Sequence, residues 1–315
     1  MPSREVSCPK HHMRVVVGGA TGFIGTALVR ALLARGDQVT ILSLHPVRAG
    51  RLGSEVEVRE WHPPAVDDWA GALIGADAAV NLSGTPVIKP WQPWTTSEKA
   101  KIRNSRVDST YALVEALRLA DPRPPVFVSQ SAIGYYGDRG SDVLTEEAPA
   151  GADFLAAVVR DWEAAALPAE DAGVRLVRTR TAVVLGKGGE MPLLELPFKL
   201  FLGGTLGRPD QWFSWIHLSD LVSLILFAID NEEVRGAVNA SAPHPVTMTT
   251  FCQQLGAALH RPSWVPFYPL LLRLALGQRA NMLLASQRVI PERARELGFV
   301  FQHPDPGEAL SSIYA

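Results

Sequence analysis

The chain has 315 residues, of which 47% are hydrophobic and 20% charged, so it can bury a large core and is too apolar for intrinsic disorder. Thirty Lys and Arg against 32 Asp and Glu give a formal charge of -2, which leaves no basic field for nucleic acid. Only Cys8 and Cys252 are present, which excludes a disulfide framework. No apolar run has the length of a membrane span, and residues 1–12 contain no secretory signal. These features predict a cytoplasmic protein without a nucleic-acid or membrane partner.

The elements alternate between short β-branched runs and helical segments. After an expected disordered tail over residues 1–12, we predict strands and helices in the order of a parallel, doubly wound α/β sheet covering residues 13–242. The strands are expected at Arg14–Val17, Gln38–Ser43, Glu55–Glu60, Ala78–Leu82, Val126–Ser129 and, as one long strand, Arg175–Leu185; the helices are expected at Phe23–Arg35, Ser97–Ala120 and Ala152–Asp171.

The pattern changes after Gly186. Residues 186–214 hold five further glycines and three prolines, which predicts a long excursion toward a substrate lobe. A helix at Leu218–Ile229 and a strand at Ala237–Ala240 then return to the sheet. Residues 243–315 are expected to form a small, mostly helical C-terminal lobe. The predicted ligand site is the cleft between this lobe and the carboxyl edge of the sheet.

A glycine-rich turn follows the first strand: Gly19-Ala-Thr-Gly-Phe-Ile-Gly25. Glycine permits the sharp turn and a close approach of backbone to a pyrophosphate, and the helix that follows offers free N–H groups to the anion. The order strand, turn, helix makes this a predicted dinucleotide site formed by Gly19, Thr21, Gly22, Phe23, Ile24 and Gly25. The alternative is a tight turn without a ligand.

The end of the second strand bears on the choice of dinucleotide. An acid there would bind the ribose 2′-hydroxyl of NAD, but Ser43 and Leu44 occupy the place and no Asp or Glu occurs between Asp37 and Glu55. Because no carboxylate would repel a 2′-phosphate and Arg48 and Arg51 are nearby, NADP(H) is favoured over NAD(H). The alternative is that both arginines are only solvated loop charges.

Several short segments resemble a known family. They are V-G-G-A-T-G-F-I-G (17–25), N-L-S-G (81–84), S-A-I-G-Y-Y-G (131–137), D-W-E-A-A-A (161–166), V-V-L-G-K-G-G (183–189), W-I-H (215–217), V-N-A-S-A-P (238–243) and Q-R-V-I-P-E-R (287–293). Over nearly all of Met13–Ala315 the chain is similar to atypical extended short-chain dehydrogenase/reductases, in the epimerase-family, cell-division-inhibitor-like subgroup. That subgroup carries a short C-terminal domain of unknown function.

The resemblance implies a Rossmann domain that binds a nicotinamide dinucleotide. It places Gly22, Phe23 and Ile24 at the pyrophosphate. Ser43 and Leu44 stand where the family has a Ser-Arg pair beside the adenosine phosphate, so Arg48 would have to replace that arginine. The remaining implied contacts are Leu82, Ser83 and Gly84 along the dinucleotide, Arg106 and Lys101 from the long helix, and Val184 beside the nicotinamide.

Dehydrogenases of this superfamily use Tyr-x-x-x-Lys, in which the ammonium lowers the pKa of the phenol for proton transfer. None of the five tyrosines here has a lysine four residues later. Counted back from Trp162-Glu163, the two expected positions hold Leu155 and Val159. The usual acid–base pair is therefore absent.

A substitute is available just after the strand Val126–Ser129. Ser131 stands at the place of the superfamily's catalytic serine, and Tyr135 and Tyr136 follow it. These three are the candidate catalytic residues. The alternative is that both tyrosines only form the wall of the pocket.

Other polar and aromatic residues are assigned mainly to structure. His217 is expected to pack or bond to backbone at a helix entry rather than contact substrate, and Ser219 or Asp220 is expected to be the N-cap of that helix. Trp91 and Trp94 either floor a substrate pocket or pack between lobes. One of the strand residues Arg178 and Arg180 is expected to point toward the cleft. No Cys, His or acidic spacing indicates a metal.

Two functional hypotheses follow from these observations. The first is an NADP(H)-dependent oxidoreductase or epimerase-like enzyme acting on an unidentified small molecule, favoured by Ser131 and a long lid. The second is a non-catalytic NADP(H)-binding sensor or scaffold, favoured by the missing Tyr-x-x-x-Lys. A homodimer is a candidate assembly by analogy with the superfamily.

Overall fold

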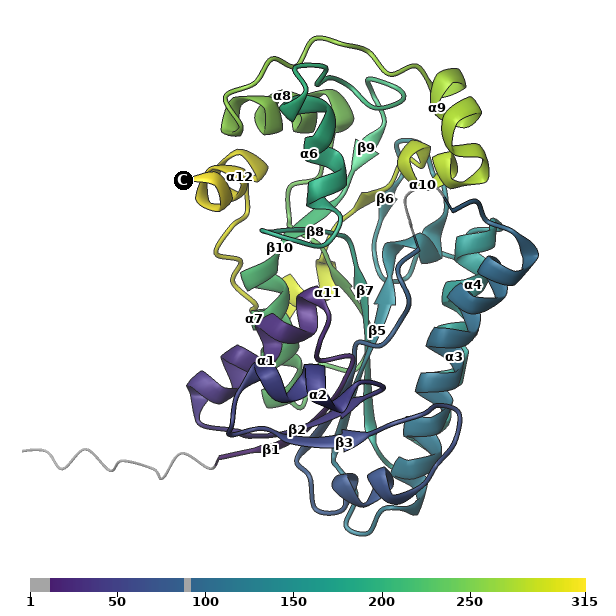
Figure 1. Cartoon of the computed structure of the whole chain (residues 1–315), viewed down its shortest axis with the longest axis vertical. Helices are drawn as coiled ribbons and strands as arrows, with labels where there is room; N and C mark the ends of the chain where they lie inside the picture. Colours follow the sequence, from purple (N-terminus) through teal and green to yellow (C-terminus); the bar gives the residue numbers. More distant parts are fainter. Residues whose placement is uncertain (1–11, 88–91) are drawn as a thin grey trace, which may run out of the picture.

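The computed structural model describes residues 12–87 and 92–315, so the expected tail lies, apart from His12, outside the described residues. At its centre is a seven-stranded sheet in the order β11-β7-β5-β4-β1-β2-β3, in which all neighbouring strands are parallel (Figure 1). The strands are β1 (Arg14–Gly18), β2 (Gln38–Ser43), β3 (Glu57–Glu60), β4 (Ala78–Asn81), β5 (Val126–Ala132), β7 (Arg175–Thr181) and β11 (Gly236–Ala240). The predicted doubly wound parallel α/β fold is confirmed.

Helices cover both faces of the sheet. Because side chains alternate along a strand, Val15 and Val17 of β1 join one apolar core and Val16 joins the other. The first core contains side chains of α1 (Phe23–Arg35) and α7 (Leu218–Asp230). The second lies against α3 (Thr96–Leu119), α4 (Phe154–Ala166) and α5 (Pro168–Asp171).

Two elements predicted as continuous are divided in the structure. The helix expected over 152–171 ends at Ala166 and restarts at Pro168, whose ring nitrogen cannot donate the hydrogen bond that would continue the first helix. The strand expected over 175–185 leaves the main sheet after Thr181, and β8 (Val183–Leu185) pairs instead with β10 (Trp215–His217). Pairing with a second strand, which the local sequence does not reveal, causes this division.

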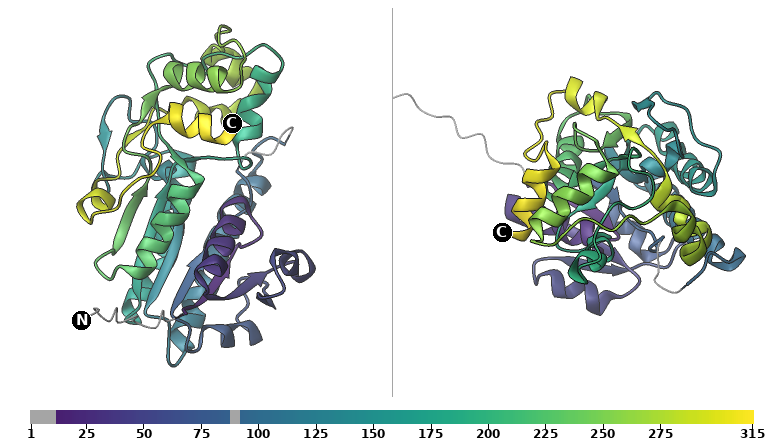
Figure 2. Two further views of the ribbon diagram at one scale, coloured as in Figure 1. Left: turned by 90° about the vertical axis from the view of Figure 1, so that its left-hand side faces the viewer. Right: turned by 90° about the horizontal axis from the view of Figure 1, so that it is seen from above.

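A second lobe lies beyond the carboxyl edge of the sheet (Figure 2). Its core combines side chains of α6 (Met191–Lys199), α8 (Met248–Ala258) and α12 (Pro306–Tyr314). The small sheet of β9 (Trp212–Phe213) and β12 (Val246–Thr247) joins them. The predicted excursion over 186–214 therefore contains the helix α6, which was not predicted because glycines and prolines are frequent in this segment.

The last part of the chain connects the two lobes. β13 (Arg288–Val289) pairs with β6 (Val143–Leu144), and the short helix α11 (Glu292–Glu296) lies beside β11. Phe299 packs against Phe227 of α7, with ring centroids 5.5 Å apart. Residues 243–315 thus include the α9 (Pro269–Leu276) and α10 (Ala280–Leu284) helices of the lobe as well as a segment attached to the main sheet.

Candidate functional site

The turn after β1 is closed tightly by backbone. Gly19 has φ +78°, and a Cβ there would lie 2.5 Å from the carbonyl carbon of Leu82. A Cβ on Gly25 would lie 2.4 Å from the Gly19 oxygen. Any larger residue at either position would displace the backbone, so both positions require glycine. The turn consequently lies directly against the loop that follows β4.

The N-terminus of α1 opens onto this turn. Its N-cap is Gly22, which supplies no side-chain hydrogen bond and is exposed. The first N–H groups of the helix therefore remain available to an anion, and the helix dipole favours negative charge there. Thr21, Phe23 and Ile24 flank the opening and are half-buried.

Phe23 joins the turn to the excursion after β8. A Cβ on Gly186, Gly188 or Gly189 would lie within 2.7–2.8 Å of the Phe23 ring, so these three glycines form a close-fitting loop around it. Val184 of β8 is buried immediately before this loop. The Gly-x-Gly-Gly string was the available sequence signal for this contact, but its partner could not be identified from spacing.

The adenosine side is less enclosed. Ser43 is buried and its Oγ accepts the N–H of His45 at 3.1 Å, whereas Leu44 is 54% exposed. Arg48 lies on the short helix α2 (Pro46–Ala49) with an exposed side chain, and no ion pair to it occurs among residues 12–87 and 92–315. Glu60, opposite Ser43 on β3, pairs with His62 at 2.9 Å.

Arg106 and Lys101 of α3 do not converge on one point. The Arg106 guanidinium packs on Gly84 and donates to the carbonyl oxygens of Thr85 and Ile102 at 3.1 and 2.9 Å. Burial lowers the pKa of Arg106 to about 10. Lys101 instead forms an ion pair with Glu98 at 2.8 Å, and its side chain is 61% exposed.

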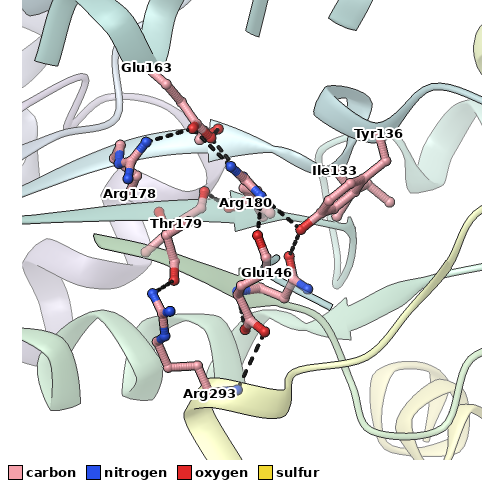
Figure 3. Close-up of polar contacts among 12 residues, drawn as sticks. Ile133, Tyr136, Glu146, Glu163, Arg178, Thr179, Arg180 and Arg293 are labelled. Atoms are coloured by element: carbon pink, nitrogen blue, oxygen red, sulfur yellow. Dashed lines mark hydrogen bonds and ion pairs between the residues drawn. The ribbon is translucent and has the colours of Figure 1, made fainter. Parts of the chain in front are cut away.

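The predicted catalytic serine, Ser131, contacts a buried ionic network, of which Figure 3 shows Glu163, Arg178 and Arg180. Ser131 donates to Glu163 of α4 at 2.6 Å. Arg180 donates to both oxygens of the same carboxylate, at 2.8 and 3.1 Å, and Arg178 donates to it at 2.9 Å. Both arginines thus meet Glu163, which sequence reasoning missed. Two arginines on one face of a buried strand were a signal that a carboxylate must lie opposite them.

The two tyrosines differ in accessibility. Tyr136 is completely buried; its hydroxyl donates to Asn239 at 2.6 Å and accepts from Arg180 at 3.0 Å. Burial raises the pKa of Tyr136 to about 12. Tyr135 is half-buried and lies edge-on to Tyr136, with the Arg180 guanidinium 3.6 Å from its ring centroid. Of the two phenols, only that of Tyr135 is partly exposed.

A second buried carboxyl group supports the network from the opposite side. Glu146 accepts the backbone N–H of Asn239 at 2.9 Å and, more weakly, that of Arg293 at 3.4 Å. Burial raises the pKa of Glu146, although these N–H groups oppose the rise. The network therefore ties the end of β5 to β11 and to the C-terminal segment.

His217 and Asp220 have structural contacts around the start of α7. His217 is the N-cap, and its Nδ1 accepts the N–H of Ser219 at 3.2 Å. The cap predicted at Ser219 or Asp220 is therefore wrong by two or three residues. Asp220 is fully buried and accepts the N–H groups of Gln302 and His303, both at 2.9 Å. Its role is to hold the C-terminal segment against α7.

The remaining predicted residues complete the picture. Trp94 donates to the Val87 carbonyl at 3.0 Å and packs edge-on to Phe154, while Trp91 lies outside the described residues. Within residues 12–87 and 92–315, no cluster of three His, Cys, Asp or Glu residues is suited to a metal. Over the same residues, none of the helices combines the length and apolarity needed to cross a bilayer.

A parallel sheet with a glycine turn and an uncapped helix at its carboxyl edge is the architecture of a dinucleotide-binding Rossmann domain. Residues 15–241 match the NAD dependent epimerase/dehydratase family, and residues 269–313 match a domain of unknown function (DUF1731). The chain belongs to the NAD dependent epimerase/dehydratase family. The predicted resemblance to the epimerase-family subgroup with this C-terminal domain is confirmed.

Relatives extend over nearly the whole chain. Human epimerase family protein SDR39U1 is 39% identical over 96% of this chain and all of the relative, and an Arabidopsis thaliana homologue called chloroplastic is 40% identical over 96% and 86%. The crystal structure of human SDR39U1 (isoform 2) with NADPH has a TM-score of 0.87 at 37% identity and covers 96% of this chain and 99% of that one. A nucleoside-diphosphate sugar epimerase from Corynebacterium glutamicum has a TM-score of 0.77 at 33% identity and covers 97% and 59%.

Proposed function

We propose that the chain binds NADP(H) and acts as an oxidoreductase or epimerase-like enzyme on a small molecule whose identity is open. The observation that carries this proposal is the uncapped N-terminus of α1 behind the Gly19–Gly25 turn. It offers free N–H groups to an anion at the point where Gly19 packs closely against the backbone of Leu82. The NADPH-bound structure of the human relative supports the same assignment.

In this proposal the turn residues Gly19, Thr21, Gly22, Phe23, Ile24 and Gly25 hold the pyrophosphate. Leu82, Ser83 and Gly84 form the adjoining wall, since a Cβ on Gly19 would already touch Leu82. Arg106, behind Gly84, supports this wall, and Val184 borders the nicotinamide. Lys101 is assigned no part in this wall, because its exposed side chain is directed to Glu98 rather than to Gly84.

NADP(H) is favoured over NAD(H) for an electrostatic reason. Ser43 and Leu44 leave the end of β2 without a carboxylate, and Arg48 is exposed one turn beyond. A phosphate near Arg48 would gain a charge-assisted contact. Glu60, on the neighbouring strand, is exposed and already has His62 as a partner at 2.9 Å.

Bound nicotinamide would supply hydride transfer to or from a substrate carbon. The chain would orient the substrate and provide a proton, and Tyr135 is the candidate donor because its phenol is the more exposed of the two. Ser131 would act by positioning Tyr135 through the Glu163–Arg180 contacts rather than as a free hydroxyl. Tyr136 would form part of the wall, since its hydroxyl already has two partners.

The alternative function is a non-catalytic NADP(H)-binding sensor or scaffold. It is favoured by the commitment of the Ser131 hydroxyl to Glu163. It is also favoured by Leu155 and Val159 on α4, which would replace the usual acid–base pair and instead pack toward Gly134. A sensor needs the dinucleotide cradle but no proton donor.

The cofactor proposal can be tested with Gly22→Asp. An aspartate at this N-cap would stabilise α1, but its charge would repel the pyrophosphate, so we expect NADPH to bind at least about tenfold more weakly without loss of stability. Gly71→Asp is the control, because Gly71 lies in open space. Fluorescence titration measures binding, and unchanged affinity in Gly22→Asp would refute the proposed site.

Two further measurements test the preference for NADPH and the role of Tyr135 separately. Arg48→Glu should weaken NADPH and leave NADH nearly unchanged; equal loss of both would refute the role of Arg48. For any carbonyl compound or sugar nucleotide that is turned over, Tyr135→Phe should abolish turnover and retain NADPH binding. Full activity of Tyr135→Phe would exclude this phenol, and binding without turnover across such a panel would favour the sensor.

A further inference from the structure

Large apolar side chains are exposed along two segments of the second lobe, residues 193–202 and 261–274, which we call the apolar lobe surface. They include Leu196, Leu200 and Phe201 at 52–61% exposure, Trp264 at 71%, and Leu270 and Leu274 at 68% and 75%. Isolated exposed apolar residues are ordinary, but a contiguous group indicates a contact surface.

The two segments lie side by side. The backbone N–H of Trp264 donates to the Gly203 oxygen at 2.9 Å, and its indole N–H donates to the Phe201 oxygen at 3.3 Å. A parallel bridge joins Leu206 to Phe267. The first segment includes most of α6 and the second includes most of α9, and both helices lie in the upper part of the molecule in Figure 1. The loops that follow α6 and precede α9 are the parts in direct contact, and Figure 2 shows the same lobe from two other sides.

The lobe core does not account for these side chains. Met191, Leu194 and Phe198 of α6 already fill that core, whereas Leu196 and Leu200 face outward. Trp264 and Tyr268, at 71% and 61% exposure, alone expose roughly 300 Å² if each has a full area of about 200–250 Å². That area reaches the range of about 300–600 Å² typical of the largest patch on a monomer, before any leucine is counted.

The charge of this surface is one-sided. No Asp or Glu occurs between Glu233 and Glu292. In residues 191–202 the acid is Glu195, which is 6% exposed, pairs with Lys199 at 2.5 Å and accepts the Tyr314 hydroxyl. Arg261 and Arg273 are exposed, and the Arg261 guanidinium lies 4.6 Å from the centroid of the Phe201 ring. A symmetric contact with a second copy would bring these like charges together, so the surface suits an anionic partner.

We propose that the apolar lobe surface docks peripherally on an anionic lipid bilayer. Leucines and aromatic rings would enter the interface while Arg261 and Arg273 meet the headgroup phosphates, the combination that binds amphipathic segments to membranes. The expectation of no membrane partner rested on the lack of a spanning run, and that criterion does not address peripheral contact. The proposal is independent of the proposed oxidoreductase activity.

Sedimentation with vesicles tests the proposal. We expect the full chain to bind vesicles of equal parts phosphatidylcholine and phosphatidylglycerol, to bind phosphatidylcholine alone much more weakly, and to be released by salt. Arg273→Gln should weaken partitioning about fivefold. The pair Leu270→Glu and Leu274→Glu should weaken it at least about tenfold. Leu119→Glu is the matched control, because Leu119 is 74% exposed at the end of α3.

Several outcomes would overturn the inference. These are absence of binding to the mixed vesicles, equal binding to both lipid compositions, or an equal loss in Leu119→Glu. A concentration-dependent dimer that Leu270→Glu and Leu274→Glu abolish would assign the surface to a second copy instead. NADPH titration of every variant checks folding separately, so failure of membrane binding is distinguishable from failure of the cofactor proposal.

Discussion

The buried Glu163 carboxylate is the residue whose replacement should be most informative about the network. Its side chain is 5% exposed and faces Arg180, which is 4% exposed, and Arg178, which is 20% exposed. Together with Ser131, the two arginines give it four hydrogen bonds. Burial opposes the charge of Arg180, but the hydrogen bond and charge of Glu163, with those of Tyr136, raise its pKa above the usual range.

Glu163→Gln keeps the shape of the side chain and removes the charge. Two guanidinium groups would then share a buried site without a counter-charge, and the new amide N–H₂ would face donors. Breaking such a pair typically costs about 3–5 kcal/mol. With an unfolding entropy near 2.1 cal/mol/K per residue over 315 residues, the melting temperature should fall by about 5–8 °C.

Thermal unfolding followed by circular dichroism measures this shift. Asp161→Asn is the matched control, because it makes the same chemical change on the same helix but breaks an exposed pair with Arg103, both side chains being about half exposed. That control should cost no more than about 1 kcal/mol. If the two variants melt at the same temperature, Glu163 does not balance a buried charge.

Three other perturbations test contacts outside the network. Asp220→Asn should lower the free energy of unfolding by about 2 kcal/mol, because one of the two backbone N–H groups of 302–303 would then face an amide donor. Chemical denaturation measures this change, and unchanged stability would show that Asp220 does not hold the C-terminal segment against α7. Burial, and secondarily a neighbouring imidazole, lowers the pKa of His217 from 6.5 to about 4. The unfolded chain therefore binds the proton first, and stability should fall as the pH decreases between those two values. His217→Asn should flatten this dependence of stability on pH, and an unaltered profile would show that another group causes it. Burial raises the pKa of the Cys252 thiol to about 11. In a variant with Cys8 replaced by serine, a thiol reagent should therefore react only after the protein unfolds. Rapid labelling of the folded protein would show that Cys252 is not buried.

The sheet and the dinucleotide turn were predictable because their signals are local. The helix bounds Phe23–Arg35 and the strand bounds Gln38–Ser43 were predicted without error, since helical periodicity and β-branched runs are properties of neighbouring residues. Glycine is required at positions 19 and 25 because a Cβ at either position would collide with nearby backbone atoms of the turn and its neighbouring loop. The division of the strand after Thr181 was not predictable, because β8 pairs with β10, whose residues lie 32 positions further along the chain.

Polar contacts between residues far apart in the sequence could not be predicted either, because the local sequence does not identify the partner. Asp220 stands where helix caps are common, yet its partners are 82 and 83 residues away. Ser131 and Glu163 come together only when α4 packs on β5. A charge in an apolar segment indicates that a partner exists, but only the fold identifies which residue it is.

The proposed cradle and the proposed acid–base site depend on different parts of the chain, and this difference constrains the chemistry that the proposed function allows. Backbone N–H groups and glycine contacts build the cradle, so it persists whatever side chains stand on α4. Proton transfer needs a side chain with a free polar atom, and the Ser131 and Tyr136 hydroxyls are already bonded within the network. Glu163 likewise cancels charge inside that network rather than presenting it to the cleft. A substrate at this edge would therefore depend on Tyr135 or on its own groups for the proton, which favours a substrate that is already polarised over one that needs a strong protein base.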